Sequence, residues 1–520
     1  MPEWGELQED QLRFMARSHP DEVAYRNLDA GTALTFAEWE RDSNRLARGL
    51  TELGVRRGDR VSIYLPAGEV LRWITAYAAV HKAGGVVVPT NTRLTVPELT
   101  TVLGHAEVGV MLTCGELLDT ARDVERDLGS LRVIVATGEL ATDLDRVAGD
   151  GPTLRAWDDV LAEDDSTYQV PVALEDLADI MYTSGTTGLP KGIAVRHSNV
   201  AMIPNHEPLW TGGGWLHGAP MFTFAGIAFV YNPMKMGLRG FYQPKFDAGR
   251  WLAYVESERP TFSMLVPSFA ELLVAHPDFE RADLTSLQQV SIGSAPLAPA
   301  THRRLIDRLP DATVGNSYGM SEAGPAYIVM PKEEIKNRVG SVGKPLGPME
   351  IKIVDDTAGD RELGPHEVGE LRMRMQGKQR EYYKDDDATD ATWTDDGWLR
   401  TGDLAYLDED GFLYICGRKK DMIIRGGNNI YATDVEAVLL EHPDVQEAAV
   451  AAVPHSVLGE DVGAWIVPRE GATLEPDALL EFCGERLADY KRPRQLHFVD
   501  ELPRNATGKV MKHRLQEQEG

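Results

Sequence analysis

The most informative stretch of the sequence is Tyr182-Thr183-Ser184-Gly185-Thr186-Thr187-Gly188-Leu189-Pro190-Lys191-Gly192. Four serine and threonine hydroxyls, three glycines and one lysine lie within these eleven residues. Glycines let backbone N–H groups turn toward an anion, hydroxyls donate hydrogen bonds, and the lysine adds positive charge. Apolar runs at Ala178–Tyr182 and Ile193–Val195 predict a strand on each side. The stretch is therefore predicted to be a polyphosphate-binding loop, although it lacks the GxxxxGK[ST] pattern of a P-loop.

The residues before this loop alternate between strand and helix patterns. Arg60–Leu65 is predicted to be a strand, Glu69–Lys82 has apolar residues at helical spacing, and Val86–Val88 is predicted to be the next strand. This βαβ order predicts a parallel sheet covered by helices. The pattern continues in predicted strands at Val110–Thr113, Arg132–Ala136 and Thr261–Val266 and in a predicted helix at Trp251–Glu258.

The pattern changes after about Ser341. Short β-like runs alternate with acidic turns, which predicts a small antiparallel sheet or barrel; they are Glu350–Val354, Glu370–Met375 and Phe412–Ile415. After Arg418 the pattern is compact α+β, with predicted helices at Ala432–Glu441 and Pro476–Leu487 and predicted strands at Val445–Val453 and Gly463–Val467. Thr433 or Asp434 is the expected cap of the first helix. The acidic run Asp385-Asp386-Asp387 is interpreted as a solvated loop.

These patterns predict an α/β fold with two domains. Residues 1–417 are expected to form a large N-terminal domain of α/β subdomains plus a small β-barrel. Residues 418–520 are expected to form a small α+β C-terminal domain, which is within the usual size of a domain.

The composition narrows the class of protein. The 520-residue chain carries 53 Lys and Arg against 81 Asp and Glu, and its net charge of −28 disfavours nucleic acid and anionic membranes as partners. Cys114, Cys416 and Cys483 form no disulfide pattern and the first residues form no signal-peptide pattern, so we expect a cytoplasmic protein. The longest apolar run, Ala219–Tyr231, is shorter than the roughly 20 residues of an integral membrane segment. A homodimer is left open.

The 182–192 stretch resembles the phosphate-binding signature of the adenylate-forming (AMP-binding) superfamily, which includes acyl-CoA and aryl-CoA synthetases, adenylation domains of peptide synthetases, and luciferases. Further segments of the family pattern follow in the expected order. They are Asn316-Ser317-Tyr318-Gly319-Met320-Ser321-Glu322, Thr401-Gly402-Asp403, Gly417–Asp421, Arg425–Tyr431 and Pro503–Lys509. Because six segments occur in order over residues 182–509, the resemblance covers most of the chain.

The resemblance implies an ATP site. Thr183 and Glu322 are expected to bind or support Mg²⁺, and Lys509 is expected to bridge the carboxylate and the α-phosphate during adenylation. Tyr318 is expected to stack on adenine, and Asp403 and Arg418 to contact the ribose. The expected catalytic residues are Lys509, Glu322, Thr183 and Lys191. The expected nucleotide- and cofactor-binding residues are Thr183, Ser184, Gly185, Thr186, Thr187, Gly188, Lys191, Gly293, Ser294, Ala295, Pro296, Asn316, Ser317, Tyr318, Gly319, Met320, Ser321, Asp403, Arg418, Gly426 and Gly427.

The resemblance also implies that the C-terminal domain is mobile. Lys420 stands at the family's hinge position, with the hinge near residues 418–421. Lys509 is expected to serve the adenylation state, and the loop around Gly426 and Gly427 to line a tunnel for the coenzyme A thiol in a second state.

The acyl pocket departs from the family pattern at one position. Trp215–Gly226 resembles the segment that carries the pocket's gate, but Thr223 stands where many acyl-CoA synthetases have His or another ring. The expected pocket residues are Phe222, Thr223, Gly226, Gly319, Gly324 and Ala326, a mostly apolar set that suits an alkyl or aryl carboxylate. The resemblance also disfavours an amino-acid substrate, because relatives that bind one place an Asp on the helix after this segment, and no Asp occurs here before Asp247.

The function implied is ATP-dependent activation of a carboxylic acid as an acyl-adenylate with release of pyrophosphate, followed by transfer to coenzyme A. ATP, Mg²⁺ and coenzyme A are the expected cofactors. The departure at Thr223 leaves two alternatives open: transfer to a carrier protein or an amine, and activation of a small anion such as nitrite for diazotisation of an arylamine. A non-catalytic adenylate sensor is disfavoured because Glu322 and Lys509 are both present. The sequence contains no HExxH motif, which excludes the zinc-protease class that depends on it.

Overall fold

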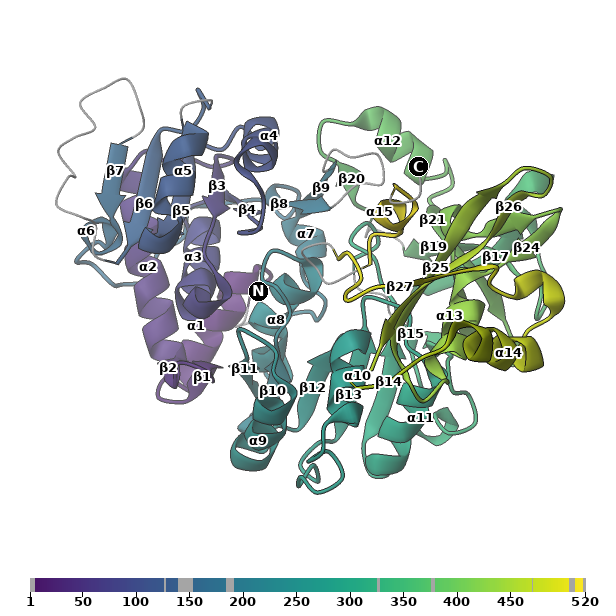
Figure 1. The fold of residues 1–520 in the computed structure, drawn as a ribbon. Helices are drawn as coiled ribbons and strands as arrows, with labels where there is room; N and C mark the ends of the chain where they lie inside the picture. The colour runs from purple at the N-terminus through teal and green to yellow at the C-terminus, as the bar shows by residue number, and fades with distance from the viewer. Residues whose placement is uncertain are drawn as a thin grey trace.

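The structure is a computed structural model that describes residues 5–125, 128–138, 153–183, 191–324, 328–375, 379–469, 471–504 and 510–517. Strands and helices alternate through its N-terminal part and antiparallel sheets follow, so the predicted α/β fold is confirmed. Figure 1 shows the purple and blue N-terminal strands on one side of the molecule and the green and yellow C-terminal third on the other. Within the described ranges, no helix is long and apolar enough to cross a membrane.

The first large sheet has eight described strands. Their order is β20 (Glu381–Tyr382), β9 (Lys191–Arg196), β8 (Leu177–Thr183), β4 (Val86–Pro89), β3 (Arg60–Ile63), β5 (Val110–Cys114), β6 (Val133–Thr137) and β7 (Thr153–Ala156). The predicted βαβ unit is confirmed, because β3 and β4 pair in parallel across helix α3 (Val70–Lys82). Strand β9 pairs antiparallel with both β8 and β20. Strand β20 therefore brings residues near 382 beside β9, one of the two strands that flank the predicted phosphate loop.

The second large sheet has seven described strands. Their order is β14 (Thr313–Ser317), β13 (Gln289–Gly293), β12 (Phe262–Leu265), β10 (Gly213–His217), β11 (Leu238–Tyr242), β1 (Val23–Asn27) and β2 (Thr32–Thr35). All neighbouring pairs are parallel except β1 with β2. Ligands of parallel α/β sheets bind beyond the carboxyl ends of the strands. The segments that follow β10, β13 and β14, three of the predicted motifs, start at that edge.

Helices cover and separate these sheets. In chain order the N-terminal ones are α1 (Gln8–Ser18), α2 (Phe36–Glu52), α3, α4 (Val96–Ala106), α5 (Leu118–Glu125), α6 (Trp157–Val160), α7 (His197–Val200), α8 (Phe224–Lys235), α9 (Ala248–Glu258), α10 (Pro267–Ala275) and α11 (Pro299–Arg308). The predicted helix at 251–258 is therefore confirmed and begins three residues earlier, because Asp247 accepts a hydrogen bond from the N–H of Arg250 and caps it.

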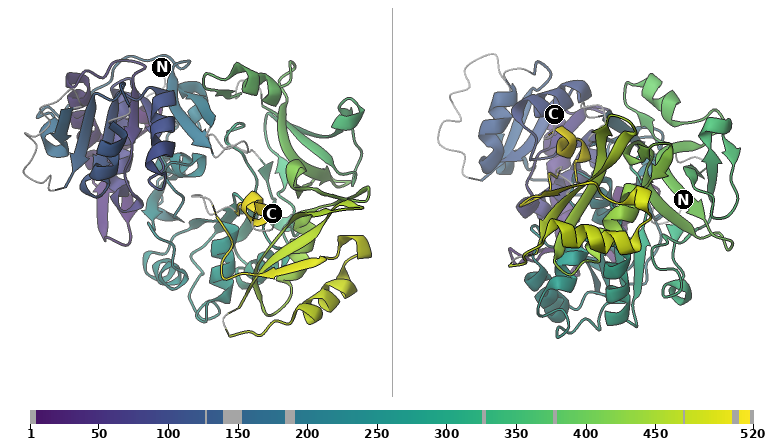
Figure 2. Two further views of the ribbon diagram at one scale, coloured as in Figure 1. Left: turned by 45° about the horizontal axis from the view of Figure 1, so that its top comes forward. Right: turned by 45° about the vertical axis from the view of Figure 1, so that its right-hand side comes forward.

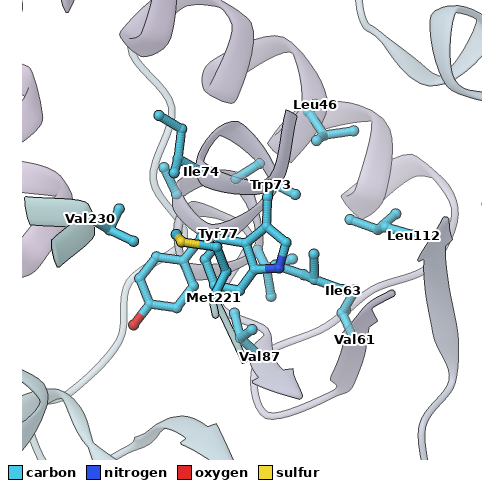
Figure 3. Close-up of a cluster of buried hydrophobic side chains, with 14 of the residues drawn as sticks. Leu46, Val61, Ile63, Trp73, Ile74, Tyr77, Val87, Leu112, Met221 and Val230 are labelled. Carbon is cyan, nitrogen blue, oxygen red and sulfur yellow. The ribbon is translucent and has the colours of Figure 1, made fainter. Parts of the chain in front are cut away.

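One hydrophobic core joins the two large sheets. Helices α2, α3 and α8 pack between them, and the core contains Tyr25 of β1 together with Val87 of β4, both without solvent exposure. Figure 3 shows Trp73 and Tyr77 of α3 in this core, with residues of both β3 and α8 nearby. Each large apolar side chain buried in this way contributes about 1.5–3 kcal/mol. The core thus fixes α8, whose first turn belongs to the predicted acyl segment, relative to the strands of the phosphate loop.

The C-terminal third contains two smaller sheets. The first has the antiparallel order β18 (Arg361–Glu362), β17 (Met349–Asp355), β19 (Gly369–Met375), β21 (Leu399–Leu407) and β22 (Leu413–Arg418). The second comprises β24 (Asn428–Ile430), β23 (Ile423–Arg425), β26 (Gly459–Pro468), β25 (Val445–His455) and β27 (Gln495–Phe498), packed with α13 (Ala432–Leu440) and α14 (Pro476–Arg486). Short elements complete the chain: β15 (Ile328–Val329), β16 (Lys344–Pro345), α12 (Asp386–Thr392) and α15 (Lys512–Glu517). Figure 2 shows this yellow C-terminal unit beside the green small sheet.

Two local predictions are wrong. The run Asp385-Asp386-Asp387 is not a loop: Asp385 accepts a hydrogen bond from the N–H of Ala388 at 2.9 Å and caps α12, whose first turn contains the other two. Neither Thr433 nor Asp434 caps α13, which begins after Tyr431. Thr433 donates instead to the carbonyl of Cys416, and Asp434 pairs with Lys491 at 2.7 Å. Both side chains therefore bind partners elsewhere in the chain and do not cap the helix.

Candidate active site

Two predicted phosphate-binding residues face each other at the loop end of one hairpin. Thr183 ends β8, Lys191 begins β9, and the two residues are partners in the antiparallel ladder. Strand β8 is buried from Ala178 to Met181 and becomes half-buried at its end. The hairpin therefore presents a fixed base for the loop. The loop residues predicted to bind phosphate, Ser184, Gly185, Thr186, Thr187 and Gly188, lie outside the described residues.

Tyr382 connects Lys191 to Glu322. Its hydroxyl donates to Glu322 Oε1 at 2.9 Å, and Lys191 Nζ lies 5.1 Å from the centre of its ring. Its backbone pairs with Ile193 of β9. Burial and the nearby Glu322 carboxylate raise the pKa of Tyr382, so the hydroxyl remains a donor at neutral pH. Sequence reasoning missed Tyr382, because only the pairing of β20 with β9 reveals that it lies between the two predicted residues.

The predicted nucleoside-binding residues also meet as ladder partners. Gly293 at the end of β13 pairs with Ser317 of β14, and Asp403 of β21 pairs with Arg418 at the end of β22. Tyr318 joins the two pairs: its hydroxyl donates to Asp403 Oδ2 at 2.5 Å, while Arg418 Nε lies 3.0 Å from Asp403 Oδ1. Burial and the carboxylate of Asp403 raise the pKa of Tyr318. The Asp403 side chain is 5% exposed. Because its carboxylate is a strong acceptor with several lone pairs, it can accept hydrogen bonds from the two hydroxyls of a ribose.

The other predicted nucleoside residues surround these partners. Ser294, Ala295 and Pro296 follow β13, and Ser294 adopts a φ of +74°, a left-handed conformation that costs a non-glycine residue of order 1–3 kcal/mol. Asn316 donates to the carbonyl of Gly340 at 3.3 Å. Gly319 and Met320 follow Tyr318, and a β-bridge between Met320 and Gly324 closes the turn that Ser321 begins. The residues from Tyr318 to Glu322 therefore form an ordered loop directly after β14.

The two residues predicted to bind the metal offer oxygen ligands that suit Mg²⁺. Glu322 offers one carboxylate and Thr183 one hydroxyl, both hard oxygen donors of the kind that Mg²⁺ prefers. Across the described ranges, no three His, Cys, Asp or Glu side chains gather into a group that could hold a metal by themselves. Mg²⁺ usually keeps several waters and binds through one or two carboxylates plus substrate phosphates. The residues present suit an ion that arrives with a nucleotide.

The acyl segment is shaped by backbone contacts. The Thr223 hydroxyl donates to the carbonyl of Pro220 at 2.7 Å and accepts from the N–H of Gly226 at 3.1 Å, so Thr223 is the N-cap of α8. A Cβ on Gly226 would lie 2.2 Å from the Pro220 carbonyl oxygen, so only glycine allows this approach. Phe222 and Gly324 are described, whereas Ala326 lies outside the described residues. The departure at Thr223 therefore replaces a ring with a cap that holds the start of α8.

Arg380 is a second residue that sequence reasoning missed. It is 1% exposed, donates to the carbonyls of Ser321 at 2.9 Å and Asn199 at 2.7 Å, and lies over the ring of Phe224 at 4.6 Å. It thereby ties the loop beyond β14 to the first turn of α8. Nothing in its local sequence marks it, because all these partners are distant in the chain.

The predicted domain junction near residues 418–421 is charged. Lys419, next to the predicted hinge residue Lys420, pairs with Asp356 and lies 3.8 Å from the buried carboxylate of Glu370. Glu370 also accepts the N–H of Gly402, the residue before Asp403, at 3.1 Å. Lys420 itself is exposed within the 3-10 turn Lys419–Asp421. Through Glu370, the predicted junction is therefore connected to β21, the strand that contains Asp403.

The two predicted features of the C-terminal part differ in whether the structure describes them. Gly426 and Gly427 form the turn between β23 and β24, with φ values of +55° and +85°. Lys509 lies outside the described residues. The bridge between Arg504 and Val510 marks where the chain enters and leaves that segment.

A buried ionic cluster supports strand β8. His81 lies between two carboxylates, with Nδ1 2.8 Å from Glu9 Oε1 and Nε2 3.1 Å from Asp179 Oδ1, and none of the three side chains is exposed. Tyr77 donates to Asp179 at 2.9 Å. Burial lowers the pKa of His81, but the hydrogen bonds and charges of the two carboxylates outweigh it and raise the pKa to about 10. Burial likewise raises the pKa of Glu9, but His81 outweighs this effect and lowers it to about 2.

Two family models match the chain. The model described as AMP-binding enzyme matches residues 12–383, and the model described as AMP-binding enzyme C-terminal domain matches residues 434–509. The feruloyl-CoA synthase of Amycolatopsis sp is 35% identical over 503 residues, which cover 96% of this chain and 96% of that protein.

Solved structures match over nearly the full length. The anthranilate CoA ligase AuaEII in complex with anthranoyl-AMP superposes with a TM-score of 0.86 at 26% identity, covering 100% of this chain and 98% of that one. The amide bond synthetase McbA from Marinactinospora thermotolerans superposes with a TM-score of 0.83 at 27% identity, covering 98% and 99%.

Proposed function

This chain belongs to the AMP-binding enzyme family, and from that membership we propose that the site described above activates a carboxylic acid with ATP and transfers it to coenzyme A. In the first step a carboxylate oxygen attacks the α-phosphorus of ATP, and pyrophosphate leaves. In the second step the thiol sulfur attacks the acyl carbonyl, and AMP leaves. The observations that carry the proposal are the contacts of Asp403 with Tyr318 and Arg418, and those of Tyr382 with Glu322 and with Lys191 of the Thr183–Lys191 hairpin.

Each group of residues has a proposed task. Asp403 and Arg418 hold the ribose, and Tyr318 lies against the adenine. Lys191 and the loop after Thr183 bind the phosphates. Glu322 and Thr183 hold the Mg²⁺ that accompanies ATP and supplies positive charge beside the phosphates. Because two anions must meet in the first step, these groups act mainly by positioning and by neutralising charge.

The C-terminal domain supplies the residues that differ between the two steps. We propose that Lys509 contacts the reacting carboxylate and α-phosphate during adenylation. Rotation near Lys420 then brings the turn at Gly426 and Gly427 to the site for the thiol reaction. Two features support this assignment: the small domain after residue 417 packs around its own core, and the short turn Lys419–Asp421 joins it to β22.

The acid is proposed to be an aryl or alkyl carboxylate. Relatives of this chain are named for ferulate and anthranilate, which makes these two acids the first members of a test panel. We also propose that the enzyme works in the cytoplasm, where its thiols Cys114, Cys416 and Cys483, all free in the structure, stay reduced.

The test is pyrophosphate release with a panel of aryl and alkyl acids, with and without coenzyme A. The proposal expects acid-dependent release that coenzyme A accelerates through repeated turnover. If an acid supports release but coenzyme A does not accelerate it with any acid, the acceptor is different. The amide bond synthetase among the structural neighbours makes an amine the second candidate, so the same assay is repeated with amines. An absence of release with every acid would contradict the adenylation step itself.

A further inference from the structure

Tyr382 occupies a position that no predicted motif contains. Its hydroxyl is bonded to Glu322 Oε1 at 2.9 Å, and its ring lies under Lys191 Nζ at 5.1 Å. Glu322 belongs to the loop beyond β14 and Lys191 to the hairpin of the first sheet. One side chain therefore touches the proposed metal-binding carboxylate and the proposed phosphate-binding lysine at once.

The backbone of Tyr382 is firmly held. Tyr382 pairs with Ile193 in the ladder between β20 and β9. Its N–H donates to the hydroxyl of Thr389 in α12 at 2.9 Å. The neighbouring carbonyl of Arg380 accepts the indole N–H of Trp393 at 2.9 Å. Since strand and helix contacts fix this backbone, the ring presents its hydroxyl and its face at set positions.

We propose that Tyr382 is a positioning residue for the nucleotide site, one that orients Glu322 toward Mg²⁺ and Lys191 toward the phosphates. The hydrogen bond to Oε1 fixes the plane of the carboxylate and so directs its second oxygen. The ring attracts the ammonium group from below, because a cation within about 6 Å of an aromatic face is stabilised. The proposal rests on the proposed function, because Glu322 and Lys191 have their tasks only in an ATP-using site.

The two contacts of Tyr382 can be removed separately. Tyr382→Phe keeps the ring under Lys191 and deletes the hydroxyl that bonds to Glu322. Tyr382→Leu deletes both contacts. Tyr383→Phe is the matched control, because Tyr383 is the next residue, is also half-buried, and faces His105 with ring centres 5.7 Å apart instead of facing Glu322.

The test measures ATP binding by calorimetry at a series of Mg²⁺ concentrations, without acid or coenzyme A, and pyrophosphate release over the same series. For Tyr382→Phe we expect the Mg²⁺ concentration for half-maximal ATP binding to rise about tenfold, the order expected for a lost hydrogen bond to a charged group. The rate at saturating Mg²⁺ should stay within about twofold of the unmodified chain. Tyr382→Leu should additionally weaken ATP binding at saturating Mg²⁺ by about threefold. Tyr383→Phe should change neither value.

An unchanged Mg²⁺ midpoint in Tyr382→Phe would overturn the proposal. So would a lower rate at every Mg²⁺ concentration with an unchanged midpoint, because that pattern indicates a general structural role. Failure of the proposed function gives a different result, since the unmodified chain itself would then release no pyrophosphate with any acid. ATP binding is measured without turnover and remains informative in either case.

Discussion

His81→Leu tests the buried cluster beneath the phosphate-binding hairpin. The change removes the imidazolium between Glu9 and Asp179, which lie 2.8 and 3.1 Å from its ring nitrogens, and leaves both carboxylates without solvent exposure. Breaking a buried ion pair by deleting one partner costs about 3–5 kcal/mol, because an uncompensated charge stays buried. We expect a loss of unfolding free energy of that size.

The control is His302→Leu. His302 is 1% exposed, and its Nε2 lies 3.0 Å from the carbonyl oxygen of Val314, but burial lowers its pKa and it is neutral at pH 7. Removing one neutral hydrogen bond costs about 1 kcal/mol. The two variants thus delete equally buried imidazoles that differ in charge.

The shifted pKa values of His81 and Glu9 determine how the free energy of unfolding changes with pH. The pKa of His81 is raised from 6.5 to about 10, so its contribution to stability is complete below pH 6.5 and is lost as the pH rises through 10. The pKa of Glu9 is lowered from 4.5 to about 2, so its contribution is complete above pH 4.5 and is lost as the pH falls through 2. Both contributions are complete only between about pH 4.5 and 6.5.

Urea unfolding of the three chains, followed by tryptophan fluorescence from pH 5 to pH 9.5, measures both effects. The unmodified chain should lose stability above pH 6.5 more steeply than His81→Leu, which lacks the imidazole that titrates. The reasoning is refuted if His81→Leu costs no more than His302→Leu at pH 6, or if both variants follow the unmodified chain in parallel across the pH range.

Three further predictions address the site. Thr223→Val should lower the free energy of unfolding by about 1 kcal/mol through loss of the α8 cap, seen as a lower urea midpoint, whereas Thr223→Ser should keep the cap; equal losses in both would contradict the capping role. Asp403→Asn should raise the KM for ATP by about tenfold or more, since it loses charge-assisted hydrogen bonds; an unchanged KM would remove Asp403 from the ribose site. Lys509→Ala should abolish adenylation but leave thioester formation from supplied acyl-adenylate intact, and Gly427→Phe should do the reverse; equal loss of both half-reactions in either variant would contradict the two-state assignment.

The sequence predicts the parts of this protein that rest on local patterns. The βαβ unit, the strands beside the phosphate loop and the change to antiparallel strands after Ser341 follow from apolar spacing and turn residues, and the structure confirms them. The ladder partners, such as Thr183 with Lys191, add the geometry that the motif order alone lacks.

The contacts that sequence analysis misses are those between distant segments. Tyr382 reaches Glu322 only because β20 joins the edge of the first sheet, and His81 meets Glu9 and Asp179 only because α1, α3 and β8 converge. The predicted cap of α13 is wrong for the same reason, since Thr433 bonds to the carbonyl of Cys416, 17 residues earlier in the chain. Local propensity carries no information on partners that are brought together by sheet topology.

The most direct test of the account is the fate of the acid's oxygen. The enzyme is given a carboxylic acid labelled with ¹⁸O in both carboxyl oxygens, together with ATP, Mg²⁺ and coenzyme A, and the products are analysed by ³¹P NMR and mass spectrometry. Attack of the carboxylate on the α-phosphorus predicts AMP that carries one ¹⁸O atom, unlabelled pyrophosphate and a thioester that keeps the other ¹⁸O. Unlabelled AMP, or label in a phosphate released from the end of ATP, would contradict an acyl-adenylate intermediate.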